Sequence, residues 1–330
     1  MQAFVTGSTG LLGSNLVHTL VDQGWEVKAL VRSREKGERF LDHPRVRLVE
    51  GDMQQVVVFV GALSEDDVLF HAAAYFREYA LPGDHHEMLR RINVDGTIAL
   101  LREAAARGVR NVVYVSSSGV LDLRPGGVRD ETAPYNEVID NAYFRSKIAA
   151  EKAISRFLES HDIRVVLALP GAMMGPGDIG VSQTGQYVIN FLNGCVGAIL
   201  PGGLAITDAR DAARAMVRMV EIGARGERFI IQGPYFDMAT IVATLARVSG
   251  VPAPRRRLSV PAAFAMATGM EVFGRLTGRP ALINRRALQR LRRSVIGSSA
   301  KAERALGTTF RPLEETLRDE VEWFRANGYT

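Results

Sequence analysis

The 330-residue sequence has one cysteine, Cys195, and no run of about twenty apolar residues. A single cysteine excludes an internal disulfide and a cysteine-rich zinc site, so we expect a reducing, cytoplasmic location. The missing apolar run argues against a membrane-spanning helix. No basic segment followed by an apolar stretch precedes the first predicted strand, so we expect no signal peptide. Nucleic-acid-binding modules are also missing, and His85-His86 lacks a carboxylate at metal-ligand spacing, so we expect neither a nucleic-acid partner nor a metal.

Acidic side chains are scarce between residues 251 and 305, where twelve Lys and Arg residues accompany only Glu271 and Glu303. The segment therefore carries a charge of +10 and the rest of the chain −5, against a total of +5. Solvated helix faces account for such a charge. The functional alternative is a lobe that attracts an anionic substrate, an acidic partner or a lipid surface. An apolar helix is predicted at residues 261–278, which packs in a core, or else forms a hydrophobic wall for the substrate or makes weak contact with a membrane surface.

The glycine-rich segment at residues 6–13, Thr-Gly-Ser-Thr-Gly-Leu-Leu-Gly, follows an apolar run and opens an amphipathic segment that ends at Gly24. A strand, a glycine-rich turn and a helix in this order are typical of a phosphate-binding βαβ start. Glycines let backbone N–H groups approach a diphosphate, and the helix N-terminus adds positive potential. The glycine spacing of i, i+3, i+6 differs from the commonest fingerprint, so an ordinary strand-to-helix turn remains the alternative.

The predicted second strand, residues 25–31, ends at Arg32 where many dinucleotide-binding folds carry an acid. An acid there accepts a hydrogen bond from the ribose 2′-hydroxyl, whereas arginine binds a 2′-phosphate. Arg32 therefore favours NADP(H) over NAD(H), with an ordinary surface charge as the alternative. Asp52 follows the third predicted strand and is placed to accept from an adenine amino group, or else it is a turn residue.

Further strands are predicted at residues 67–74, where the strand runs into small residues, and at 112–115 and 165–170. Helices at about 93–107 and 141–160 separate them. Alternating strands and helices predict an α/β fold, namely a doubly wound, parallel Rossmann-type sheet with a smaller, mostly helical C-terminal lobe. We expect residues 1–170, completed by part of 205–235, to bind the dinucleotide. Residues 171–330, interleaved with that domain, are expected to bind the substrate.

Tyr143 and Lys147 lie four residues apart in the helix predicted at 141–160, so the phenol and the ammonium share one face. Lowering the phenol pKa from about 10 toward 7 costs about 4 kcal/mol. An ammonium about 4 Å away supplies a similar amount at an effective dielectric constant near 20. The pair can therefore form a general acid that protonates a carbonyl oxygen while hydride reaches the carbon. A serine at the end of the preceding strand can hold that oxygen.

With these motifs in this order, the chain resembles the extended short-chain dehydrogenase/reductase family, also called the NAD-dependent epimerase/dehydratase family. Its C-terminal part is similar to bacterial members grouped with dihydroflavonol 4-reductase. The matching residues are Thr6, Gly7, Gly10 and Gly13; Gly51 and Asp52; His71, Ala73 and Ala74; Asn93, Val94, Gly96 and Thr97; Ser116 and Ser117; Tyr143 and Lys147; Gly175, Pro176, Gly177 and Asp178; and Asp208, Arg210, Asp211 and Ala212.

The resemblance implies roles for particular residues. It points to Ser117 as the catalytic serine, with Ser118 as its rival, and to Asn93 as a residue that helps to order a proton-relay water. It also implies that Lys147 holds the nicotinamide ribose. The catalytic set is thus Ser117, Tyr143, Lys147 and Asn93. Residues expected to bind the cofactor are Thr6, Gly7, Thr9, Gly10, Leu11, Leu12, Gly13, Arg32, Asp52, Met53, Ala72, Ala73, Ala74, Tyr143, Lys147 and Pro170.

These residues favour an NADP(H)-dependent oxidoreductase that reduces a ketone or aldehyde on a fairly apolar small molecule. The alternative is a nucleotide-sugar epimerase, whose substrate diphosphate would suit the basic segment 251–305. A catalytically idle NADP-binding protein is a third possibility, against which the intact Tyr143–Lys147 pair argues. Residues 75–90 and 177–204 are expected to select the substrate, and the resemblance is compatible with a homodimer or a monomer.

Overall fold

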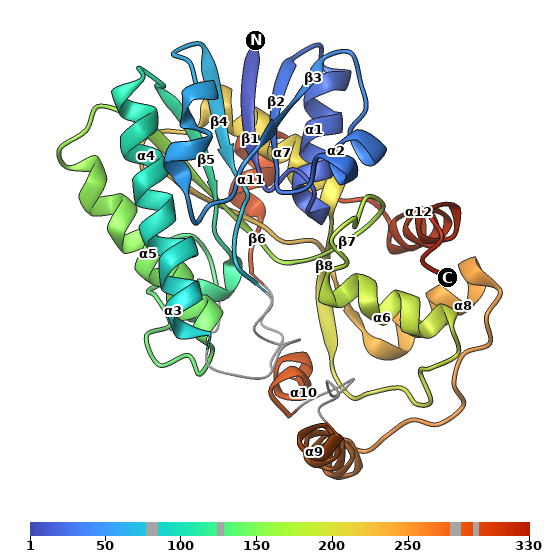
Figure 1. Cartoon of the computed structure of the whole chain (residues 1–330). Helices are drawn as coiled ribbons and strands as arrows, with labels where there is room; N and C mark the ends of the chain where they lie inside the picture. Colours follow the sequence, from blue (N-terminus) through green and yellow to red (C-terminus); the bar gives the residue numbers. More distant parts are fainter. Residues whose placement is uncertain (77–84, 124–128, 278–284, 293–296) are drawn as a thin grey trace.

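The computed structural model describes residues 1–76, 85–123, 129–277, 285–292 and 297–330, and its two parts are a large parallel sheet and a smaller lobe (Figure 1). In the described chain, seven strands form the large sheet in the order β3-β2-β1-β4-β5-β6-β9. Their bounds are β1 Gln2–Thr6, β2 Glu26–Val31, β3 Val46–Glu50, β4 Asp67–His71, β5 Asn111–Val115, β6 Arg164–Pro170 and β9 Arg228–Ile231. Every pair of neighbours is parallel. The predicted doubly wound sheet is therefore confirmed.

Helices cover both faces of this sheet. Helices α1 (Leu11–Asp22), α7 (Ala209–Ile222) and α11 (Ala300–Leu306) pack on one face, and α4 (Thr97–Ala106) and α5 (Ala142–Leu158) pack on the other. The remaining elements of this part are α2 Arg34–Phe40, the short 3₁₀ helices Val56–Val58, Val60–Ala62 and Ser118–Val120, α3 His86–Leu89, and a π-helical turn Arg90–Gly96 that continues into α4.

Strand β5 shows why the central strands read as unbroken apolar runs. Val113 and Val115 belong to the core beneath α1 and α7, whereas Val112 and Tyr114 belong to the core beneath α4 and α5. Successive side chains of a strand point to opposite faces, so a strand covered on both sides is apolar at every position. Asn111 opens the strand as a half-buried polar residue, and Tyr114 carries a buried hydroxyl that accepts from Lys147 of α5.

The smaller lobe contains the second sheet, in which β8 lies between β7, its parallel neighbour, and β10, its antiparallel neighbour. Its elements are β7 Ala172–Met174, α6 Gln183–Leu192, β8 Gly203–Asp208, β10 Tyr235–Asp237, α8 Met238–Ser249, α9 Val260–Thr277, α10 Arg285–Arg292 and α12 Leu313–Ala326. A third core, formed mainly by α6, α8 and α12, holds the lobe together. Throughout the described parts of the chain, each helix falls short of the length and apolar character that crossing a bilayer requires.

Asp208 and Arg210 join the C-terminal helix α12 to the start of α7. Asp208 caps α7 by accepting from the Arg210 N–H at 2.8 Å, and Arg210 also bridges to Asp319 of α12 at 2.5 Å. The hydroxyl of Thr316 donates to the Asp208 carboxylate at 2.8 Å. This motif, matched to the family from the sequence, therefore fastens α12 to the sheet in this structure.

Gly13 allows α1 to begin directly on the glycine-rich turn. A Cβ atom at this position would lie 2.0 Å from the Gly7 carbonyl oxygen and 2.6 Å from its carbon. Both are backbone atoms, so neither can move aside without shifting the turn. The structure thus requires a glycine here for close backbone packing.

We expect Gly13→Ala to lower the free energy of unfolding by about 1–3 kcal/mol, because the added methyl group overpacks a rigid backbone contact. Gly269→Ala is the matched control, because Gly269 also lies within a helix but has no heavy atom within 4 Å of the added Cβ. The control should gain about 0.5–1 kcal/mol from helix propensity. Urea denaturation measures both values, and equal effects of the two substitutions would contradict this packing argument.

Candidate active site

The predicted site residues gather along the carboxyl edge of the large sheet, where Thr6 of β1, His71 of β4 and Tyr114 of β5 stand side by side in register. The chain winds outward in opposite directions from β1 and β4, so this edge is the topological switch point at which α/β sheets bind ligands. Pro170 ends β6 at the same edge. The structure thus brings together residues that are up to 164 positions apart in the sequence.

The glycine-rich turn lies against the end of β4. Gly7 has φ = 73°, and a Cβ there would meet the backbone nitrogen of Ala73 at 2.7 Å. The Ala73 N–H donates to the Thr6 hydroxyl at 3.1 Å, which ties β1 to the segment after β4. Ala72 and Ala73 are half-buried beside the turn and Ala74 is exposed. Small residues at this place leave the backbone of the turn accessible to a ligand.

The N-terminus of α1 is open to an anion. Gly10 is the N-cap residue and offers no side chain to the first turn, and Thr9 just before it is half-buried. The N–H groups that begin the helix, at Leu11, Leu12 and Gly13, therefore have no side-chain cap. An uncapped N-terminus behind a glycine turn fits the diphosphate of a dinucleotide.

The loop that follows β7 closes over this turn. Ser14 donates to the Gly177 carbonyl at 2.7 Å, and Asn15 donates to the Pro176 carbonyl at 2.7 Å. A Cβ at Gly180 would stand 3.4 Å from the Thr9 carbonyl oxygen. The Gly175–Asp178 motif thus fixes the lobe to α1 beside the candidate dinucleotide site.

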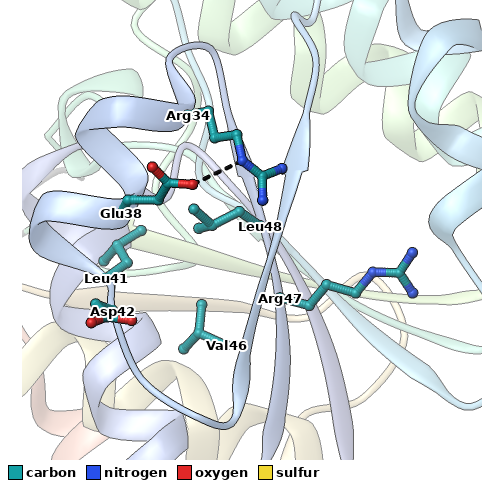
Figure 2. Close-up of a pocket in the computed structure, with 7 residues that line it drawn as sticks. All are labelled: Arg34, Glu38, Leu41, Asp42, Val46, Arg47 and Leu48. Carbon is teal, nitrogen blue, oxygen red and sulfur yellow. Dashed lines mark hydrogen bonds and ion pairs between the residues drawn. The ribbon is translucent and has the colours of Figure 1, made fainter.

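Two arginines follow β2, and their contacts differ. Arg34 begins α2 and forms an ion pair with Glu38 at 2.9 Å, as Figure 2 shows. Arg32 is exposed, and its guanidinium has no hydrogen bond or ion pair among the described residues. The pocket drawn in Figure 2, about 540 Å³ in volume, lies between α2 and β3 and contains none of the predicted catalytic residues. Arg32 is thus the arginine left available at this strand end.

Asp52 and Met53 follow β3 on the adenosine side of the expected site. Asp52 is half-buried and accepts from the Gln54 N–H at 2.8 Å, so it also stabilises its own turn. Met53 is buried, and its carbonyl oxygen would lie 2.9 Å from a Cβ at Gly96. The turn after β3 therefore packs against the start of α4.

Tyr143 and Lys147 occupy the first half of α5, whose N-terminus is capped by the Asn141 side chain. The Lys147 ammonium lies 5.9 Å from the centre of the Tyr143 ring, which confirms that both side chains share a face. Tyr143 is 8% exposed, and its ring packs edge-on against Phe76 with centroids 4.5 Å apart. Tyr75 and Phe76 begin the 75–90 segment expected to face the substrate, of which residues 77–84 lie outside the described residues.

The Lys147 ammonium points into the protein, where only 2% of the side chain is exposed. It donates to the Val115 carbonyl at 2.8 Å and to the Tyr114 hydroxyl at 3.3 Å. Burial lowers the pKa of Lys147 to about 7, and the charge of Glu151 opposes this shift. The cation that was expected to tune Tyr143 is therefore itself sensitive to its surroundings near neutral pH.

Three serines follow β5 and lie in different environments. The Ser116 hydroxyl is buried and donates to Glu151, and Ser118 is buried in a 3₁₀ turn. Ser117 is half-buried and accepts from the Gly119 N–H at 3.3 Å. A Cβ at Gly119 would collide with the ring of Phe144, so this turn packs against the first turn of α5 next to Tyr143. Of the two serines considered from the sequence, Ser117 is the less buried.

Asn93 lies in the π-helical turn and is buried. Its amide accepts from the Tyr75 N–H at 2.7 Å, and donates to the Tyr75 carbonyl at 3.1 Å and to the Ser146 hydroxyl at 2.9 Å. Ser146 in turn donates to the Tyr143 carbonyl at 2.7 Å. In this structure the Asn93 side chain thus links the loop after β4 to the helix that carries Tyr143. The water-ordering role implied by resemblance stays a prediction.

His71 is a structural residue in this network. Thr97 donates its hydroxyl to the Asn93 carbonyl at 2.8 Å, so it accepts from the His71 ring at 2.9 Å, and the other ring nitrogen accepts from Thr6 at 2.7 Å. Burial, with the nearby charge of Lys147, lowers the pKa of His71 to about 3. The ring is therefore neutral and holds β1, β4 and α4 together.

Sequence reasoning did not select Tyr114, Ser146 or Glu151. Tyr114 reads as one more core residue of an apolar strand, and Ser146 as an ordinary helix residue. Glu151 carried a usable signal, because it follows Lys147 by four residues and must share its helix face. Within the described residues, no three His, Cys, Asp or Glu side chains are placed to hold a metal ion.

Comparison with known proteins identifies a family and several relatives of this chain. A model of the NAD dependent epimerase/dehydratase family matches residues 3–231. Sterol demethylase protein B of Methylococcus capsulatus is 30% identical, covering 99% of this chain and 99% of its own length. A putative dihydroflavonol 4-reductase of Synechocystis sp. is 31% identical over 99% of this chain and 95% of its own.

Among solved structures, the UDP-glucuronic acid 4-epimerase of Bacillus cereus in complex with UDP-glucuronic acid and NAD has a similar fold. Its TM-score is 0.78 at 17% identity, covering 99% of this chain and 100% of that one. The family match spans most of the large sheet and every residue of the predicted catalytic set. The resemblance seen in the sequence is thus confirmed, and the chain belongs to the NAD dependent epimerase/dehydratase family, the extended short-chain dehydrogenases/reductases.

Proposed function

We propose that this protein is an NADP(H)-dependent oxidoreductase that reduces a ketone or aldehyde on a small, fairly apolar molecule. The observation that carries the proposal is the Tyr143–Lys147 pair of α5, with the lysine buried against β5 and the tyrosine beside the loop after β4. An exposed helical pair would have no reason to bury an ammonium, because desolvation of a charge is costly.

In the proposed reaction, Ser117 donates a hydrogen bond to the carbonyl oxygen of the substrate. Tyr143 gives its phenolic proton to that oxygen, and the Lys147 ammonium stabilises the phenolate that remains. When bound, NADPH supplies the hydride that reduces the carbonyl carbon. Asn93 holds Tyr75 and Ser146 in place, so it keeps the substrate-facing loop aligned with the helix that carries Tyr143.

The uncapped α1 N-terminus and the glycine turn would bind the diphosphate of the cofactor, and Arg32 would bind its 2′-phosphate. Lys147 and Pro170 would border the nicotinamide riboside. We further propose that residues 171–330 supply the substrate-binding lobe. Strand β9, from the same part of the chain, completes the large sheet. A relative named sterol demethylase protein B and another named dihydroflavonol 4-reductase support a ring-bearing, apolar substrate.

A nucleotide-sugar epimerase is the second candidate. Arg255, Arg256 and Arg257 are exposed in the lobe, and they would suit the diphosphate of such a substrate. In an epimerase, the bound nicotinamide is reduced and then oxidised again within one turnover, so no cofactor is consumed. A reductase consumes one NADPH in each turnover. A panel of ketones, aldehydes and nucleotide sugars, followed by NADPH absorbance and product analysis, decides between them. NADPH oxidation matched by alcohol formation supports reduction, and isomerised sugar without net oxidation supports epimerisation.

We expect Tyr143→Phe to lower kcat by about 10²–10⁴-fold, because it removes only the proton donor. Binding of NADPH, measured by fluorescence titration, should stay nearly unchanged because the ring and its packing against Phe76 remain. Adding Phe144→Tyr to the Tyr143→Phe variant returns a phenol one residue away, on a different face of the helix. This double variant should not regain activity. A Tyr143→Phe variant with kcat within threefold of the parent would remove Tyr143 from the mechanism.

We also expect NADPH to bind at least about tenfold more tightly than NADH, because a charged hydrogen bond to a phosphate contributes about 1.5–3 kcal/mol. Arg32→Ser should remove most of this preference. Arg34→Ser is the control, since Arg34 is already paired with Glu38. Titration of each variant with both cofactors tests this assignment, and equal affinities for NADPH and NADH in the parent protein would refute it.

A further inference from the structure

Glu151 is a buried carboxylate one helical turn beyond Lys147, with 2% of its surface exposed. One of its oxygens accepts from the Ser116 hydroxyl, and the other accepts from the Tyr135 hydroxyl at 3.2 Å. The guanidinium of Arg228, from β9, lies 3.8 Å from the second oxygen. Ser116, Tyr135 and Arg228, which come from three separate segments of the chain, thus converge on the Glu151 carboxylate. The proposed reaction gives this carboxylate no role.

These contacts favour the ionised form of Glu151. Burial raises the pKa of its carboxyl group, and the hydrogen bond from Ser116, the charge of Arg228, the hydrogen bond from Tyr135 and the charge of Lys147 all act against that shift. A buried carboxylate that has two hydrogen-bond donors and two cations around it can remain charged in a site where an isolated one could not.

Lys147 needs a negative partner, because the atoms that accept from its ammonium are neutral. Val115 offers a carbonyl and Tyr114 a hydroxyl, whose pKa burial raises well above its usual value. The nearby His71 ring is neutral, so it neither repels nor stabilises the cation strongly. Among the ionisable groups packed around Lys147 in the described residues, Glu151 is the one whose charge favours the ammonium.

We propose that Glu151 is a positioning residue that keeps the Lys147 ammonium charged in its buried place beside Tyr143. Glu151 acts on the Tyr143–Lys147 pair only through the charge of Lys147, and it does not touch the substrate. The geometry carries this assignment: Ser116 fixes the carboxylate at the end of β5, and the same strand end supplies the Val115 carbonyl that orients Lys147. The kinetic part rests on the proposed function, whereas the charge of Lys147 can be measured without any substrate.

The chain has five lysines, so selective ¹³Cε labelling of lysine gives five NMR signals, each assignable with one Lys→Arg variant. In the full-length parent protein, the Lys147 signal should titrate near pH 7. In Glu151→Gln, the midpoint should fall by about one pH unit or more, because the opposite charge that favours the ammonium is gone. Glu151→Asp should restore most of the parent midpoint.

Glu159→Gln is the matched control, because Glu159 is an exposed acid at the end of the same helix. It should leave the Lys147 midpoint unchanged. A measurement on the unaltered protein guards against a variant that fails to fold: the Lys147 signal should show a second, smaller inflection in acid, as Glu151 takes up its proton. An unchanged midpoint in folded Glu151→Gln, or the absence of this inflection, overturns the proposal.

With a reducible carbonyl compound, the kcat of Glu151→Gln should decline at a pH about one unit lower than that of the parent, because Lys147 loses its proton earlier as the pH rises. The KM for NADPH should change little, since Glu151 lies behind the pair. A uniform loss of kcat at every pH would indicate a structural role and would overturn the proposal. If the parent reduces no carbonyl compound, the proposed function fails, and the NMR titration alone still decides the role of Glu151.

Discussion

The burial of the Lys147 ammonium is the constraint on which the rest of the site depends. Water is almost excluded from this side chain, so the protein must supply its partners: a carbonyl from β5, a hydroxyl from Tyr114 and the opposing charge of Glu151. Each partner comes from the strand that ends beside α5 or from α5 itself. The position of α5 against β5 is therefore fixed by polar contacts as well as by packing.

The same strand edge serves both expected ligands. Thr6 and His71 are hydrogen-bonded to each other beneath the glycine turn. The centroid of the His71 ring lies 5.6 Å from that of the Tyr114 ring, and the Tyr114 hydroxyl accepts from Lys147. A continuous row of buried polar side chains thus joins the candidate diphosphate site to the candidate proton donor. Thr6 is hydrogen-bonded to His71, and Lys147 to Tyr114, so these buried polar groups cost less to bury than they would without partners.

Much of this organisation follows from local sequence. The parallel sheet could be predicted because each strand is apolar on both faces and is followed by a helix, and the Tyr143–Lys147 face because the helical repeat fixes which residues are neighbours. The glycine turn was recognisable because it comes directly after a strand. Residues 54–63 have an apolar sequence without a clear period, and the two short 3₁₀ helices found there leave Val57 and Val58 exposed.

Long-range pairings were beyond the sequence. Nothing near Glu151 shows that Ser116, Tyr135 and Arg228 converge on it, and nothing near Asn93 shows that its amide is bonded to Tyr75 and Ser146. Such contacts depend on how strands and helices pack. The sequence around each of these residues is compatible with many different hydrogen-bond partners. The network around the candidate catalytic pair was therefore visible only in the structure.

The central claim is that Tyr143 delivers a proton next to a bound nicotinamide. A crystal structure of the protein with NADPH tests this most directly. The account predicts a diphosphate at the start of α1 and a nicotinamide ring at the end of β6, with its reactive carbon facing the space in front of the Tyr143 hydroxyl. A nicotinamide bound elsewhere, with that hydroxyl turned away and no movement of α5 or the loop after β4 able to join them, would contradict it.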